Sequence, residues 1–109
     1  PFQYGRLLFT HNGFIQNFRQ TLYREIRDRI NDTAYQTIHG STDSEHIFAL
    51  LIHELQATPD SNLETALHQT LVTLDELAAS YQVSVSANII VSDGHRLVAS
   101  RFARNAAPP

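Results

Sequence analysis

The longest regular pattern in the chain lies between residues 61 and 78, and it predicts an amphipathic helix. Small and apolar residues recur there at helical spacing: Leu63, Ala66, Leu67, Thr70, Leu71, Leu74, Leu77 and Ala78. This spacing places them on one face, which must be buried against another element. Ser61 with Glu64 has the spacing of a capping box and predicts where the helix begins. The fold must therefore provide a layer that covers a long helix.

The segment after this helix predicts such a layer. Residues 83–89 read Val-Ser-Val-Ser-Ala-Asn-Ile, an alternation typical of a strand with one buried face. Asp93-Gly94 then suits the positive φ angles of a type I′ hairpin turn. Residues 96–102 are expected to return as the partner strand. The C-terminal part of the chain thus predicts an antiparallel hairpin.

The N-terminal half predicts two further strands or strand ends and two more helices. Residues 1–6 indicate a hairpin approach into the apolar run Leu7-Leu8-Phe9, which should end in a turn at Asn12-Gly13. Residues 14–30 have helical spacing, and residues 34–38 suggest a loop or brief strand. Thr42-Asp43-Ser44-Glu45 has the capping-box form and predicts another helix. Together these elements favour an α+β fold with helices packed on one face of a largely antiparallel sheet.

Two short motifs suggest chemistry. Asn12-Gly13 follows a buried strand, so a side-chain amide and a backbone N–H could point at one spot and stabilise charge on a carbonyl oxygen. On its own the dipeptide is more often a simple turn. Asp43 could bind a cationic group, or it could only complement the dipole of the helix that it begins. Neither motif settles its role alone.

Together the motifs resemble the class II, or N-terminal nucleophile, glutamine amidotransferases. The resemblance rests on His11-Asn12-Gly13, the amphipathic segment after it, and Thr42-Asp43-Ser44-Glu45. Pro1–Arg6, Asp93-Gly94 and Arg101 are most similar to small stand-alone members, such as the gamma-glutamyl hydrolase of ergothioneine synthesis. The resemblance covers roughly Pro1 to Phe102. It implies an α/β/β/α sandwich, of which this chain would form the C-terminal part.

The resemblance also implies a role for each motif. In the family, an N-terminal Cys attacks the amide of glutamine or a gamma-glutamyl compound, and its α-amino group acts as base. Asn12 would donate its side-chain N–H and Gly13 its backbone N–H to the oxyanion, and Asp43 would bind the substrate's α-ammonium group. The family's Arg for the substrate carboxylate lies upstream of the matched region.

The chain contains no cysteine. We therefore expect residues 1–109 to be a single, partial amidotransferase domain that lacks the N-terminal segment with the nucleophile. Alone, this piece should be inactive, and the open face of its sheet should be covered by the missing segment or by a partner chain. The alternative is a non-catalytic module that keeps the fold to bind a partner or an amino acid.

Composition narrows the remaining classes of function. A formal net charge of −3 argues against nucleic acid or an anionic membrane as the main partner. All eight basic residues are arginine, which excludes Walker-type phosphate binding and lysine Schiff-base chemistry within the chain. His46 and His53 are two helical turns, roughly 10 Å, apart, too far to ligate one ion. We expect no metal, no cofactor and a cytoplasmic setting.

Overall fold

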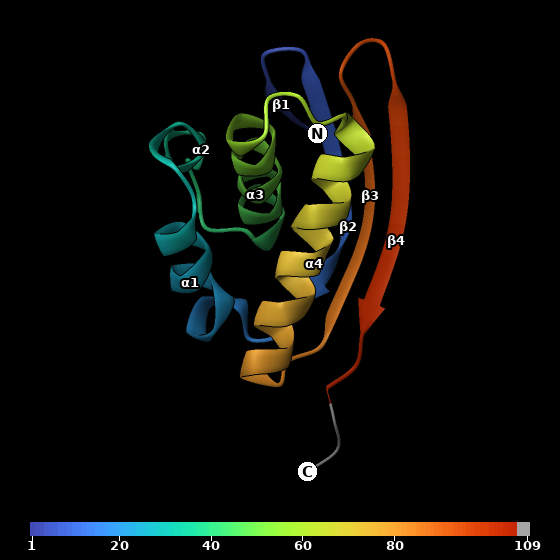
Figure 1. Cartoon of the computed structure of the whole chain (residues 1–109). Coiled ribbons are helices and arrows are strands. Elements are labelled where there is room, and N and C mark those ends of the chain that lie inside the picture. Colours follow the sequence, from blue (N-terminus) through green and yellow to red (C-terminus); the bar gives the residue numbers. More distant parts are fainter. Residues whose placement is uncertain (107–109) are drawn as a thin grey trace.

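The computed structural model describes residues 1–106, which form a four-stranded sheet with helices on one face (Figure 1). All strand pairs are antiparallel, in the order β1-β2-β3-β4. The strands are β1 (Phe2–Tyr4), β2 (Leu7–Ile15), β3 (Val85–Ser92) and β4 (Leu97–Arg104). The helices are a short 3₁₀ helix η1 (Phe18–Gln20), α1 (Leu22–Arg29), α2 (Asp32–Gln36), α3 (Asp43–Ala57) and α4 (Leu63–Tyr81). The predicted α+β class is confirmed.

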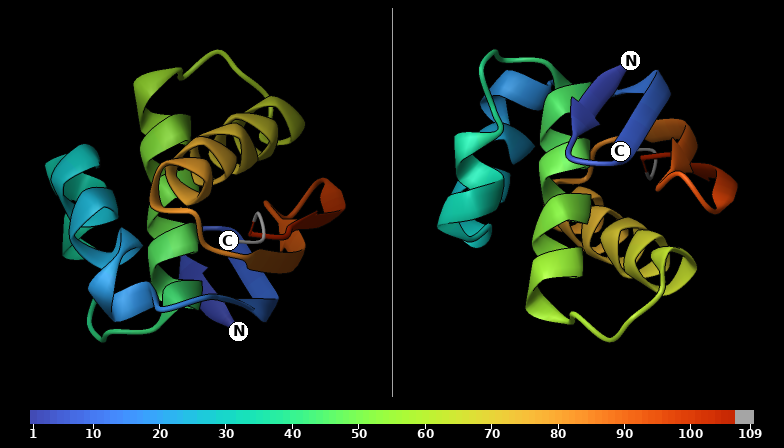
Figure 2. Two further views of the ribbon diagram at one scale, coloured as in Figure 1. Left: turned by 90° about the horizontal axis from the view of Figure 1, so that it is seen from below. Right: turned by 90° about the horizontal axis from the view of Figure 1, so that it is seen from above.

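Helix α3 forms the centre of the core. Figure 2 shows it between the sheet and the pair α1 and α2, with α4 beside it. Its residues His46–Ile52 are all buried. Because seven consecutive residues are buried, this part of the helix is enclosed on all sides and not along a single stripe. Phe48 of α3 stacks on Phe9 of β2 with ring centroids 4.8 Å apart, which fixes the helix against the sheet.

The predicted turn at Asn12-Gly13 is wrong, because β2 continues through it to Ile15. The reason is tertiary pairing: β2 faces β3 without interruption from the pair Leu8 and Ser92 to the pair Ile15 and Val85. Asn12 does not adopt the positive φ that a type I′ turn would require. Residues 14 and 15 are thus strand, and the predicted helix over residues 14–30 is reduced to η1 and α1.

Two other local predictions also need correction. Residues 34–36 belong to α2 and not to a loop or strand, because the Asn31 side chain accepts a hydrogen bond from the N–H of Ala34 (2.9 Å) and caps this helix. Residues 37 and 38 follow the helix and form the loop that was predicted. The last helix begins one residue later than predicted, since Asn62 caps α4 by accepting from the N–H of Thr65 (2.8 Å). Ser61 is not its N-cap.

The β3–β4 hairpin is present, but its turn is not type I′. Of the two central residues, only Gly94 has a positive φ (+93°). The Asp93 carboxylate accepts from the N–H groups of His95 (2.9 Å) and Arg96 (2.8 Å), which closes a longer connection between Ser92 and Leu97. The side chain of Asp93, rather than left-handed backbone at two positions, stabilises the turn.

The sheet face opposite the helices is open within residues 1–106 (Figure 2). Strand alternation places Phe9 and Ile15 of β2 in the core, and Leu8, Asn12 and Phe14 on the other face. Large apolar side chains there are substantially exposed: Leu8, Phe14, Ile90 and Leu97. No helix in residues 1–106 has the length and apolarity needed to cross a membrane.

His46 joins α1 to the start of α3. Its Nδ1–H donates to the carbonyl of Thr42 (2.6 Å), and its Nε2 accepts from the Nε–H of Arg27 (3.0 Å). A guanidinium only donates and a carbonyl only accepts, so these partners require a neutral ring with its proton on Nδ1. The ring is fully buried and packs against Phe18 and Tyr23. Its charge state is therefore tied to the packing of two helices.

This contact predicts a loss of stability in mild acid. Burial lowers the pKa of His46 below its ordinary value of about 6.5; the hydrogen bond to Thr42 and nearby acidic groups raise it, and Arg27 lowers it further. Stability from the neutral ring is complete above the unfolded pKa and is lost as the pH falls below it. Urea unfolding at about pH 7.5 and 5.5 should show a smaller pH effect in His46→Gln than in the parent protein.

The matched control is His68→Gln, which removes an exposed histidine from α4. It should leave the pH dependence of the free energy of unfolding as it is in the parent. Equal pH dependence in the parent and in His46→Gln would contradict the assigned neutral ring.

Candidate functional site

Two hydrogen bonds attach the beginning of α3 to β2. The Asp43 carboxylate accepts from the N–H of Ile15 (Oδ2 to N, 2.9 Å), and Ser44 Oγ lies 2.7 Å from Nδ1 of His11. These contacts flank Asn12-Gly13 on both sides along the strand. The Asn-Gly pair and the acidic residue, thirty positions apart in the sequence, are therefore brought to one place by the fold.

Hydrogen bonds between nearby residues fix the start of α3 at Thr42 and Asp43. Thr42 Oγ1 accepts from the N–H of Glu45 (3.2 Å), as predicted. The Glu45 carboxylate does not return to Thr42, as a capping box would require; it accepts from the N–H groups of Gly40 (2.7 Å) and His39 (3.3 Å). Glu45 thus orders the loop that leads into the helix, and Asp43 is left to contact β2.

Gly13 is at a position that no other residue type fits. Its φ is +147°, a value that side chains disfavour. A Cβ added there would lie 2.0 Å from the backbone carbonyl oxygen of Ser86 and 3.2 Å from Nε2 of His11. Glycine therefore permits β2 to approach β3 closely at this position. The backbone around the Asn12–Gly13 peptide is held by packing rather than by a turn.

Alternate N–H groups of β2 point to opposite edges. The N–H of Gln16 donates to the carbonyl of Ser84 beside β3 (2.9 Å), whereas the N–H of Ile15 faces the opposite edge. The N–H of Gly13 shares the edge of Ile15 by this alternation. Strand β1 pairs with β2 only as far as Phe9, so no strand in residues 1–106 covers this edge at Gly13.

The side chain of Asn12 lies on the open face of the sheet. It borders a shallow hollow of about 530 Å³, whose polar lining includes Asn88 and Arg101 from the neighbouring strands. Asn88 Nδ2 donates to the backbone carbonyl of Asn12 (3.3 Å), and Arg101 Nε donates to Asn88 Oδ1 (3.2 Å). A row of three polar residues therefore crosses the sheet at this register.

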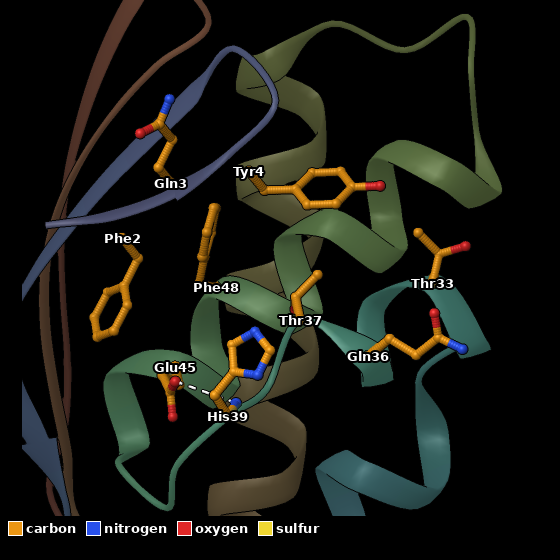
Figure 3. Close-up of a pocket in the computed structure, with 9 residues that line it drawn as sticks. All are labelled: Phe2, Gln3, Tyr4, Thr33, Gln36, Thr37, His39, Glu45 and Phe48. Atoms are coloured by element: carbon orange, nitrogen blue, oxygen red, sulfur yellow. Dashed lines mark hydrogen bonds between the residues drawn. The ribbon is translucent and has the colours of Figure 1, made fainter.

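A second hollow, of about 390 Å³, lies between β1, α2 and the start of α3 (Figure 3). Aromatic rings of Phe2, Tyr4 and Phe48 border it, with Glu45 and His39 at one end. It contains none of Asn12, Gly13 and Asp43. We do not take this hollow as the candidate site, because its one carboxylate, Glu45, already accepts from the backbone N–H groups of Gly40 and His39.

Metal binding has no support in the described part of the chain. No group of three or more His, Asp or Glu side chains within residues 1–106 is arranged to hold an ion. Of the two histidines weighed above, His46 is bonded to Arg27 and Thr42, and His53 Nδ1 accepts from the N–H of Asn31 (3.0 Å). Both therefore have structural partners.

Comparison with known proteins identifies the family. A family model described as class II glutamine amidotransferases matches residues 1–106. The chain belongs to the class II glutamine amidotransferases. A solved structure, described as a glutamine aminotransferase class-II domain protein from Silicibacter pomeroyi, superposes with a TM-score of 0.76 and 29% identity. This superposition covers 100% of the present chain and 48% of that protein, so the chain spans about half of its solved relative.

A curated relative gives the same family from sequence. The chain is 46% identical over 55 residues to the probable glutamine amidotransferase DUG3 of Saccharomyces cerevisiae. The match covers 50% of this chain and 15% of the yeast protein. The resemblance predicted from the motifs of the sequence is thus confirmed at the level of the amidotransferase family.

Sequence reasoning missed the contacts that bring these candidate residues together. The pairing of His11 with Ser44 had no signal other than their places beside the two motifs. The contact of Asp43 with a backbone N–H depends on β2 extending to Ile15. A strand of that length was not expected, because the sequence predicted a turn at Asn12-Gly13. Asn88 was visible only as a polar residue in an alternating strand.

The geometry at Gly13 predicts that Gly13→Ala strongly destabilises the protein. The Cβ must displace the Ser86 backbone and also tolerate a positive φ, so we expect the free energy of unfolding to fall by about 2 to 5 kcal/mol. Chemical denaturation measures this loss. Gly5→Ala is the control: its φ is +57° but a Cβ meets nothing within 4 Å, so about 1 to 2 kcal/mol is expected. Equal losses in both variants would contradict the close approach at Gly13.

Proposed function

We propose that this chain is the part of a class II amidotransferase domain that supplies the oxyanion donors and the carboxylate for the substrate's ammonium group. The complete domain would hydrolyse the amide of glutamine or of a gamma-glutamyl compound through a cysteine thioester. Asn12 and Gly13 would bind the oxyanion, and Asp43 the α-ammonium group. The hydrogen bond from the N–H of Ile15 to Asp43 supports this most directly, because it holds the acid two residues from Gly13 along β2.

The hydrogen-bond donors and acceptors of these three residues suit the proposed roles. Asn12 has a side-chain N–H donor on an exposed part of β2, and the N–H of Gly13 faces an edge that no described strand covers. Two fixed donors can stabilise a tetrahedral oxyanion, and each is typically worth roughly 3 kcal/mol of barrier. Asp43 uses Oδ2 toward Ile15, and a carboxylate has lone pairs left for a cation.

The proposed reaction has two stages. The cysteine sulfur attacks the amide carbon, and a C–S bond forms while the carbonyl oxygen takes up negative charge between Asn12 and Gly13. The C–N bond then breaks, and ammonia or an amine leaves with a proton supplied through the α-amino group of the cysteine. Water hydrolyses the thioester, which releases the carboxylic acid and restores the thiol.

The nucleophile must come from outside these 109 residues, because they contain no cysteine. We propose that an N-terminal segment of the complete protein, or a partner chain, supplies it together with the arginine for the substrate carboxylate. The same segment could cover the open face with its exposed Leu8, Phe14, Ile90 and Leu97 and complete an α/β/β/α sandwich. Residues 1–109 would then be a partial domain, inactive alone; the cytoplasmic setting stays a prediction.

A second candidate is a non-catalytic module that retains the fold for binding. The exposed apolar face supports it, because such a face can hold a protein partner without chemistry. The two candidates differ in whether Asn12 affects turnover. A pure binding module has no need for a donor at that position.

Asn12→Ala tests the oxyanion role in the full-length parent. Turnover of glutamine should fall about a hundredfold or more while affinity changes little, because the lost donor acts mainly on the transition state. Steady-state kinetics gives kcat and KM separately. The control Asn105→Ala removes an exposed asparagine after β4 and should leave both values unchanged. Unchanged turnover in Asn12→Ala would favour the binding module.

Asp43→Asn tests the ammonium role without removing the contact to β2, since the amide oxygen can still accept from the N–H of Ile15. Loss of a charge-assisted contact should raise KM for glutamine about 10- to 100-fold. A substrate analogue without the α-amino group should be hydrolysed equally by the parent and the variant. Asp28→Asn, which removes an exposed charge from α1, is the control.

If Asp43→Asn left the preference for glutamine over that analogue unchanged, Asp43 would be only the first acid of α3. Kinetics with both substrates therefore separates recognition of the ammonium group from a structural role.

A further inference from the structure

We propose that Asn88, held by Arg101, is a positioning residue that aims the N–H of Gly13 into the oxyanion site. This inference rests on the proposed function. It starts from the row of polar residues that crosses three strands on the open face, where Asn12 pairs with Asn88 and Asn88 pairs with Arg101.

The partners of Asn88 fix the orientation of its amide. Arg101 Nε can only donate, so the atom 3.2 Å from it must be the amide oxygen of Asn88. This leaves Nδ2 of Asn88 facing the backbone carbonyl of Asn12 at 3.3 Å, and a carbonyl can only accept. Both contacts are satisfied in one orientation of the amide and in neither after a flip. Arg101 therefore selects the orientation in which Asn88 donates.

The carbonyl of Asn12 and the N–H of Gly13 belong to the same peptide group. A trans peptide is planar, and its C=O and N–H point in opposite directions. A donor that holds the carbonyl of Asn12 toward β3 thereby directs the N–H of Gly13 toward the opposite edge of β2. That is the edge where the Asp43 carboxylate lies against the N–H of Ile15.

The peptide group between Asn12 and Gly13 needs additional restraint because one of its two residues is a glycine. Gly13 has a φ of +147° and no side chain, so fewer steric limits hold its backbone than would hold any other residue. On the β3 side, strand pairing already points the backbone N–H of Asn88 at the Asn12 carbonyl, so the Asn88 side chain supplies a second donor to the same oxygen. A rotation of the peptide would keep Asn12 in place but move the second donor away from the oxyanion.

Asn88→Asp in the full-length parent tests this directly. The side chain keeps its size and can still accept from Arg101, but it cannot donate to the Asn12 carbonyl. We expect kcat for glutamine to fall about five- to tenfold, the usual effect of one lost hydrogen bond. KM and the melting temperature should change little. In ¹H–¹⁵N NMR spectra, the amide signal of Gly13 should shift more than signals elsewhere in β2.

Arg101→Met is a second variant that leaves Asn88 in place but frees its amide to flip. It should lower kcat by a smaller factor, again with little change in KM. Thr10→Ala, on the same face of β2 and outside the polar row, should leave kcat and the Gly13 signal as in the parent protein.

Asn12→Ala distinguishes the two possible failures. If Asn12→Ala lowers turnover but neither Asn88→Asp nor Arg101→Met does, the positioning role is overturned and the proposed function stands. If Asn12→Ala leaves turnover unchanged, the oxyanion assignment is overturned and the positioning role falls with it. If Asn88→Asp lowered both kcat and the melting temperature while the Gly13 amide signal stayed in place, Asn88 would stabilise the fold without positioning the Gly13 N–H.

Discussion

The attachment of the first turn of α3 to β2 is the constraint on which the site depends. Asp43 accepts from the N–H of Ile15, and Ser44 meets His11 on the other side of the Asn-Gly pair. Neither motif has a fixed place relative to the other without these bonds, since η1, α1 and α2 separate β2 from α3 in the chain. The core supports them, because burial of His46–Ile52 leaves α3 little freedom to slide along the sheet.

Much of the fold could be predicted because its strongest signals are local. The helical period of α4, the alternation of β3 and the Thr42 cap of α3 each depend on side chains close in sequence. The prediction was wrong where tertiary pairing overrides a local signal. Asn12-Gly13 has the composition of a turn, yet eight residue pairs with β3 extend β2 through it. No local pattern reports a neighbouring strand seventy residues away.

The residues of the candidate site also differ in whether a local sequence pattern reveals them. Asn12, Gly13 and Asp43 could be named as candidates because they stand in motifs, and their roles stay predictions. Asn88 stood in no motif, and Arg101 was named only as part of the resemblance, without a role. The register of the strands sets Asn12, Asn88 and Arg101 in one row across the sheet. Register follows from pairing of whole strands, so single positions in the sequence do not show it.

The short pairing of β1 has a consequence for where a substrate could lie. Asn12 presents its side chain on the open face of β2, whereas Asp43 reaches the strand from the helix side at Ile15. A molecule that contacts both must lie at the edge between these faces. β1 covers that edge only as far as Phe9, and the N–H of Gly13 emerges beyond it. In the proposed function, a longer β1 would stabilise the sheet but occupy the second oxyanion donor. An unpaired stretch of strand edge, which proteins usually cover, is thus what the proposed chemistry requires.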